Sequence, residues 1–77
     1  MRINRKKIRN STPLTVGLID FIKRVLVLGG SVRLIPDTGY TDLYLRYPSG
    51  TEEMIRIHAG YHAVARSLGL DPQAITP

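Results

Sequence analysis

The spacing of the apolar residues changes once along this chain, at Gly29-Gly30, and this change constrains the fold more than any other feature. Before the glycine pair, apolar residues recur every three or four positions, which is typical of one face of a helix. After the pair, they alternate with polar residues in three short segments, which indicates half-buried strands. The apolar stripe before the pair consists of Leu14, Leu18, Phe21 or Ile22, Val25 and Leu28. The sequence therefore predicts a helix followed by a sheet.

Capping and turn residues supply the order of the elements. Ser11-Thr12-Pro13 predicts a helix start near Pro13, because a hydroxyl can cap free amides and proline fits the first helical position. The predicted strands cover residues 31–36, 43–47 and 53–58, with turns at 37–39 and 48–51, and a second helix runs from Gly60 or Tyr61 to Leu68. The predicted fold class is α+β in the order α-β-β-β-α. Both helices are expected on one face of a three-stranded antiparallel sheet whose other face is open.

The charge is distributed very unevenly. The chain of 77 residues has a net charge of +5, and the whole excess lies in the first ten residues, whose basic side chains are Arg2, Arg5, Lys6, Lys7 and Arg9. This segment has too few apolar residues to fold, so we predict a flexible basic arm over residues 1–11 and a single domain over 12–77. Two interpretations are open: the arm contacts phosphate groups, or it is a solvated terminus that keeps the protein soluble.

Several classes of site and of protein are not expected. The chain has no cysteine, which excludes disulfides, thiolate zinc sites and a cysteine nucleophile. Its apolar segments fall far short of the ~20 residues that span a bilayer, so we expect a cytoplasmic protein without membrane contact. No glycine-rich segment matches a phosphate-binding loop, and no cofactor is expected. His58 and His62 are four residues apart without a carboxylate or cysteine beside them, so neither a metal site nor a catalytic residue is assigned.

Strand alternation predicts which side chains share a face. The expected buried face holds Val32, Leu34, Leu43, Leu45, Tyr47, Ile55 and Ile57, and the opposite face holds Arg33, Ile35, Tyr44, Arg46, Met54, Arg56 and His58. Each strand thus places one arginine on the open face. The acidic residues Asp37, Asp42, Glu52 and Glu53 are expected at the hairpin ends. Guanidinium groups bind phosphate or a guanine edge, and a tyrosine ring stacks on a base.

The open face and the arm together predict a binding surface. Its expected residues are Arg33, Tyr44, Arg46, Arg56 and His58, joined by Arg2, Arg5, Lys6, Lys7 and Arg9 of the arm. The alternative is that an open sheet face is simply polar, because arginine stems cover neighbouring apolar groups.

These motifs resemble those of four known families. The α-β-β-β-α order over residues 13–70 resembles double-stranded-RNA-binding domains and small ribonuclease toxins of the HicA type, although Gly39-Tyr40-Thr41 stands where those toxins have Gly-Ser-His. Residues 32–66, with the turn "TGY", resemble the three-stranded DNA-binding domains of tyrosine integrases. In "HAVARSLGLDPQAITP", the spacing of Ala65, Gly69 and Ile75 resembles helix-turn-helix regulators.

The expected function is non-enzymatic nucleic-acid binding, with DNA preferred over RNA. One alternative is a small phage or mobile-element inhibitor or adaptor that binds an acidic protein surface, such as that of a nuclease or defence complex. Another is a HicA-like ribonuclease toxin that uses a histidine as general base. The first helix also has apolar residues outside its main stripe, namely Val16, Ile19, Leu26 and Val27. These predict either a homodimer through this helix or deep packing against the sheet.

Overall fold

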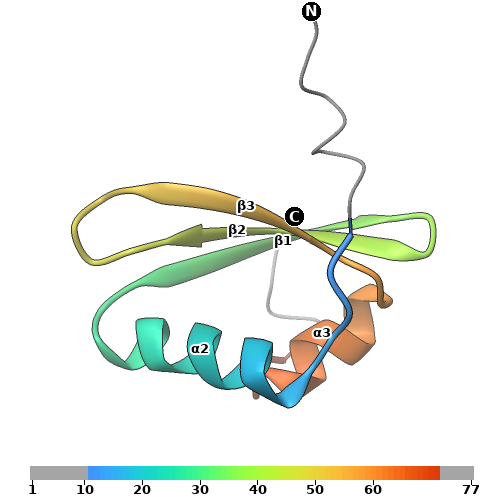
Figure 1. The fold of residues 1–77 in the computed structure, drawn as a ribbon, viewed down its shortest axis with the longest axis horizontal. Coiled ribbons are helices and arrows are strands. Elements are labelled where there is room, and N and C mark those ends of the chain that lie inside the picture. Colours follow the sequence, from blue (N-terminus) through green and yellow to red (C-terminus); the bar gives the residue numbers. More distant parts are fainter. Residues whose placement is uncertain (1–10, 72–77) are drawn as a thin grey trace, which may run out of the picture.

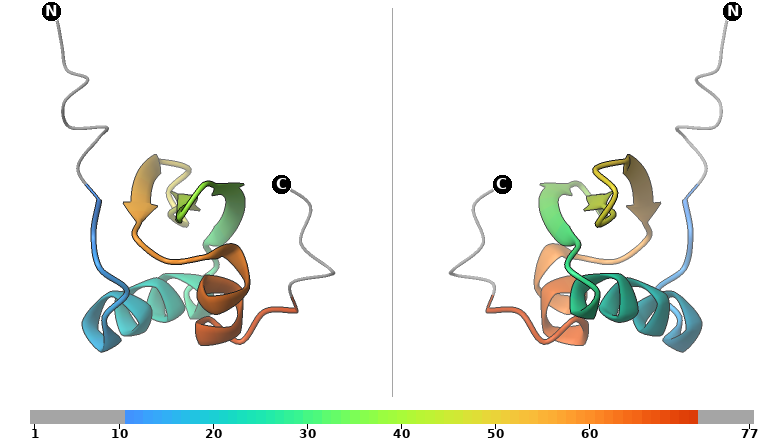
Figure 2. Two further views of the ribbon diagram at one scale, coloured as in Figure 1. Left: turned by 90° about the vertical axis from the view of Figure 1, so that its right-hand side faces the viewer. Right: turned by 90° about the vertical axis from the view of Figure 1, so that its left-hand side faces the viewer.

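The computed structural model describes residues 11–71 and confirms the predicted order of elements. The elements are α2 (Val16–Val27), β1 (Ser31–Asp37), β2 (Tyr40–Arg46), β3 (Glu52–Ile57) and α3 (Tyr61–Ser67). Both helices lie on one face of the antiparallel sheet, and in these residues no element covers the other face (Figure 1). Viewed from either end of the sheet, α2 and α3 form one layer beneath the strands (Figure 2). The predicted arm lies outside the described residues, apart from Ser11.

The first helix begins later than predicted. Its N-cap is Thr15, whose side-chain oxygen accepts a hydrogen bond from the Leu18 amide at 3.1 Å. The prediction of a start at Pro13 is wrong because Thr12 belongs to the sheet instead. The Thr12 amide donates to the Arg56 carbonyl at 2.8 Å, and its carbonyl accepts from the His58 amide at 2.9 Å. Thr12 thereby forms a short parallel bridge with Ile57 on the outer edge of β3.

The helix ends at the glycine pair, as predicted. Gly29 has a φ of 108°, a backbone conformation that residues with a Cβ rarely adopt. Gly30 is needed for a different reason. A Cβ on this residue would lie 2.5 Å from the Arg46 carbonyl oxygen and 2.6 Å from Cγ1 of Val25. The passage from α2 into β1 therefore requires glycine at both positions.

The second strand begins earlier than predicted. Asp37 pairs with Tyr40, so the first turn contains only Thr38 and Gly39. Gly39 has a φ of 75°, and the Thr38 amide donates to Oδ1 of Asp37 at 2.7 Å. A turn of two residues lengthens both strands of the hairpin. Residues 40–42, which we expected before the strand, consequently lie inside it.

The core lies between the sheet and the two helices. Its fully or almost fully buried apolar residues are Ile22, Val25, Leu34, Leu43, Leu45, Ile57, Val64, Ala65 and Leu68. The buried strand positions are among those predicted from alternation. In the helix stripe, where Phe21 or Ile22 was expected, Ile22 enters the core, whereas Leu28 departs from the prediction because it is 68% exposed. Among the residues outside that stripe, Ile19 and Leu26 pack against the core, whereas Val16 and Val27 face solvent.

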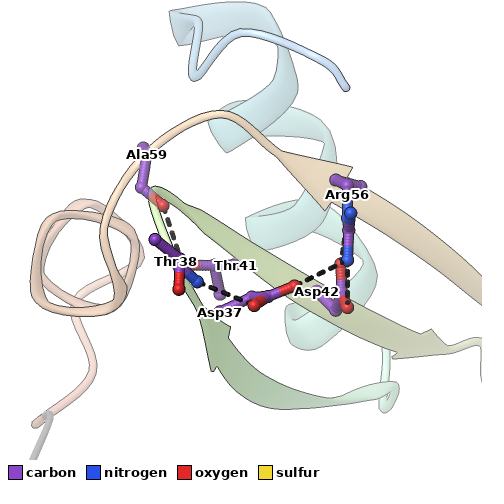
Figure 3. A network of polar contacts seen from close by, with 6 residues as sticks. All are labelled: Asp37, Thr38, Thr41, Asp42, Arg56 and Ala59. Carbon is purple, nitrogen blue, oxygen red and sulfur yellow. Dashed lines mark hydrogen bonds and ion pairs between the residues drawn. The ribbon is translucent and has the colours of Figure 1, made fainter. Parts of the chain in front are cut away.

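Two polar contacts complete the inner side of the sheet. Thr41 is fully buried, and its hydroxyl donates to the Ala59 carbonyl at 2.9 Å, which ties the connection before α3 to β2 (Figure 3). At the opposite end, the Tyr47 hydroxyl donates to Oε1 of Glu53 at 2.6 Å. This hydrogen bond to a carboxylate raises the pKa of Tyr47 above its ordinary value. Among the helices described, none has the length and apolar character needed to cross a membrane.

Candidate nucleic-acid interface

The strand register arranges the open face of the sheet in four rows of side chains. The rows are Ser31–Arg46–Glu52, Arg33–Tyr44–Met54, Ile35–Asp42–Arg56 and Asp37–Tyr40, with His58 beside Tyr40. Alternation places all of these side chains on the side away from the helices. Two halves of the face can be distinguished. We call the first two rows the Arg33 half and the last two rows the Arg56 half.

In the Arg56 half, the arginine is bound to two carboxylates (Figure 3). Its Nε donates to Oδ1 of Asp42 at 2.7 Å, and its Nη2 donates to Oδ2 of the same residue at 3.0 Å. The same Nη2 also donates to Oδ2 of Asp37 at 3.0 Å. The hydrogen bonds to Asp42 raise the pKa of Arg56 even above its usual high value, so this guanidinium stays charged. The two parallel hydrogen bonds from Arg56 to the Asp42 carboxylate have the bidentate geometry that arginine favours.

The expected separation of acids from arginines on the open face is wrong in this half. We expected Asp42 at a hairpin end, but the early start of β2 makes it a strand residue directly opposite Arg56. The side chains of Asp42 and Arg56 are only 17% and 21% exposed, and both carboxylates of the cluster sit on one guanidinium. Arg56 therefore presents little uncompensated charge to a ligand.

In the Arg33 half, neither arginine forms an ion pair with a carboxylate of residues 11–71. The two ion pairs within these residues both involve Arg56. The guanidinium carbon of Arg33 lies 4.6 Å from the centre of the Tyr44 ring, a cation–π distance. Arg46 is exposed at the end of β2, in the neighbouring row. The Tyr44 ring is half-buried between Arg33 and Met54. Two exposed cations thus flank an aromatic ring that the sheet holds in place.

The histidines have separate surroundings. His58 is exposed and stacks on Tyr40, with ring centroids 4.9 Å apart, and Arg56 lies over the same tyrosine at 5.4 Å. His62 is exposed in the first turn of α3, where its ring meets Tyr61 edge-on. Within the described part of the chain, no group of three or more metal-ligating side chains comes together. His58 and Tyr40 thus form a stacked pair of rings at one end of the Arg56 half.

The remaining predicted residues lie outside the described range. These are Arg2, Arg5, Lys6, Lys7 and Arg9 of the arm, together with Ile75 of the helix-turn-helix spacing. The point where the arm joins the domain is described, however. Thr12 is hydrogen-bonded to the edge of β3 beside Arg56 and His58. The basic segment is therefore attached at the border of the open face.

Comparison of the chain with protein-family models, with curated proteins and with solved structures finds no match.

The sequence analysis missed the role of two acidic residues and one aromatic residue. Asp37, Asp42 and Tyr40 surround Arg56, and we had assigned none of them to the open face. The sequence feature that could have indicated this arrangement is the pair Thr38-Gly39, because a glycine in this place is compatible with a two-residue hairpin turn. A hairpin closed at Asp37 and Tyr40 gives Tyr40 and Asp42 the same parity as Tyr44 and Arg46.

Proposed function

We propose that the chain is a non-enzymatic nucleic-acid-binding protein that uses the Arg33 half of the sheet and the basic arm. The observation that carries this proposal is the guanidinium of Arg33 stacked on Tyr44 beside the exposed Arg46. Arginine can bind a phosphate or a guanine edge with two parallel hydrogen bonds, and an aromatic ring supports a base or sugar. The five basic residues of the arm then supply attraction that does not depend on base sequence.

Duplex DNA is the preferred target in this proposal. Adjacent strands of a sheet lie about 4.8 Å apart, so three strands span roughly 10 Å between their axes. The major groove of B-form DNA is about 12 Å wide and admits strands. The major groove of A-form RNA is too narrow for side chains to read. An exposed, largely uncurled sheet with arginines on its open face fits the DNA groove better.

Arg56 has a supporting role in the proposal. Because its guanidinium is bound to Asp42 and Asp37, its replacement would both remove a cation and release two carboxylates. A loss of binding in an Arg56 variant would therefore have two causes. Arg33 and Arg46 are the informative positions.

The test is an electrophoretic mobility series on duplex DNA, single-stranded DNA and structured RNA at two salt concentrations. Replacement of Arg33 and Arg46 together by alanine should weaken binding to duplex DNA by about tenfold or more, since each arginine contact is worth on the order of 1 kcal/mol or more. The matched control is Arg66→Ala, which removes one exposed charge from α3, on the other side of the sheet. Equal loss in the control, or no binding to any nucleic acid, would overturn the proposal.

A second candidate function has an observation of its own. The open face also carries the half-buried apolar side chains Ile35 and Met54 beside Tyr44, and arginine, tyrosine and methionine are enriched at protein interfaces. This favours an inhibitor or adaptor that binds an acidic protein surface. Capture from a lysate treated with nuclease separates the two candidates, because only a protein partner survives the treatment. Cleavage of the RNA during the mobility series would instead favour a ribonuclease.

A further inference from the structure

The side of α2 that faces away from the sheet is unusually apolar. Its exposed residues include Val16 at 74%, Val27 at 84% and Leu28 at 68%. With about 3.6 residues per turn, these positions fall on the arc opposite Ile22, which enters the core. Phe21, which is 45% exposed, lies at the border of this arc, and its ring meets the Tyr47 ring edge-on, with ring centroids 6.3 Å apart. Figures 1 and 2 show this side of α2 at the base of the molecule, away from the strands. The open face of the sheet therefore lies on the opposite side of the domain.

Two charged residues of opposite sign lie in the middle of this apolar arc. Asp20 and Arg24 are one helical turn apart, and no ion pair joins them in the described structure. Together with Gly17 and Phe21 they line a shallow, open hollow on the helix surface. A Cβ on Gly17 would meet only the side-chain oxygen of Thr15, at 4.0 Å. Glycine is less favourable than alanine in a helix, and no neighbouring atom in the described residues requires it here.

We propose that a second copy of this chain covers this arc, with the two α2 helices antiparallel about a two-fold axis. The two-fold axis passes between the levels of Asp20 and Arg24, so that each Asp20 lies opposite the Arg24 of the other copy. This register makes the surface complementary to itself, as an isologous dimer requires. In this register, each of these charges also faces an opposite charge of the other copy.

The apolar residues fit the same register. Val16 and Val27 occupy one flank of the arc. The two-fold axis places Val16 of each copy beside Val27 of the other copy. Gly17 and Leu28 occupy the other flank, so the leucine of one copy covers the hollow at the glycine of the other. Phe21 lies at the border of that flank, at the level of the axis. Val16, Val27 and Leu28 are thereby covered by the other copy, and the glycine allows the helices to approach closely.

The proposed dimer is reversible. A helix of 12 residues is about 18 Å long, so one face of α2 buries less than the roughly 1,200–2,000 Å² of a standard stable interface. We therefore expect association in the micromolar range or weaker. The dimer leaves both open sheet faces accessible, so it is independent of the proposed function.

The test is sedimentation equilibrium of the full chain over a wide concentration range. Asp20→Arg alone and Arg24→Asp alone should each weaken self-association by about tenfold or more, because like charges then meet in the seam. A one-to-one mixture of these two variants should form a heterodimer, since each arginine of one variant then faces an aspartate of the other. The chain carrying both substitutions should dimerise like the unaltered protein.

Two further variants complete the experiment. Val27→Glu, at a position that is 84% exposed, should abolish dimerisation without lowering the melting temperature of the monomer. Arg66→Asp is the matched control, because it reverses an exposed charge on α3 and should leave the dimer intact. An unaltered protein that stays monomeric at the highest concentration would overturn the proposal. So would single charge variants that associate as well as the unaltered chain.

Discussion

At the scale of single residues, the described structure depends on a few polar groups whose partners are distant in the sequence. Thr41 and Asp42 are neighbours in β2 but point to opposite faces of the sheet (Figure 3). The hydroxyl of Thr41 holds the Ala59 carbonyl on the helix side, whereas the carboxylate of Asp42 holds Arg56 on the open side. One pair of adjacent residues thus organises both faces of the sheet at the same end.

Replacement of Thr41 by valine tests the contact on the helix side. The substitution keeps the shape of the side chain but leaves the partly buried Ala59 carbonyl without its donor, so we expect a loss of about 1–3 kcal/mol in the free energy of unfolding. Urea denaturation measures this loss. Thr41→Ser retains the hydroxyl and serves as the control. A valine variant as stable as the unaltered protein would show that this hydrogen bond contributes nothing.

At the scale of elements, the start of α2 differs from the start that the local motif predicts. Local preference favours Ser11-Thr12-Pro13, where a hydroxyl precedes a proline. The structure uses Thr15, because Thr12 makes two backbone hydrogen bonds with β3. The sheet edge therefore decides where the helix begins.

Alanine substitutions at the two hydroxyl sites test this assignment. Thr15→Ala removes the acceptor for the Leu18 amide and should lower the free energy of unfolding by about 0.5–2 kcal/mol. Ser11→Ala is the control and should change stability by less than about 0.5 kcal/mol, because Ser11 is exposed and outside the helix. Equal effects in urea denaturation would contradict Thr15 as the cap.

At the scale of the whole molecule, the arginines of the strands and the exposed apolar residues of α2 lie on opposite sides of the domain. The open sheet face carries Arg33, Arg46 and Arg56, the far side of α2 carries exposed valine and leucine, and the net charge of +5 belongs to the arm. On the open face itself, the acids of the Arg56 half compensate their arginine, so the free cations lie in the Arg33 half. The two proposals therefore concern opposite surfaces.

Deletion of residues 1–9 tests the contribution of the arm to nucleic-acid binding. Each phosphate contact contributes about 0.9 to the slope of log affinity against log salt on duplex DNA. Removal of the five basic residues should reduce this slope by up to about four or five, while the Arg33 half continues to bind at low salt. Titrations at several salt concentrations measure the slope. An unchanged slope would mean that the arm makes no phosphate contact.

Local sequence patterns are sufficient to predict the order of the elements, the end of the first helix at Gly29 and which strand residues face the core. These features are local, because spacing and backbone preference act over a few residues. Three features depend instead on contacts between distant segments: Thr12 joins the edge of β3, Asp42 and Asp37 bind Arg56, and Val16, Val27 and Leu28 stay outside the core. Each of these features depends on the strand register or on how much of the helix surface the sheet covers. Both are set by segments far apart in the chain, so local sequence patterns do not predict them.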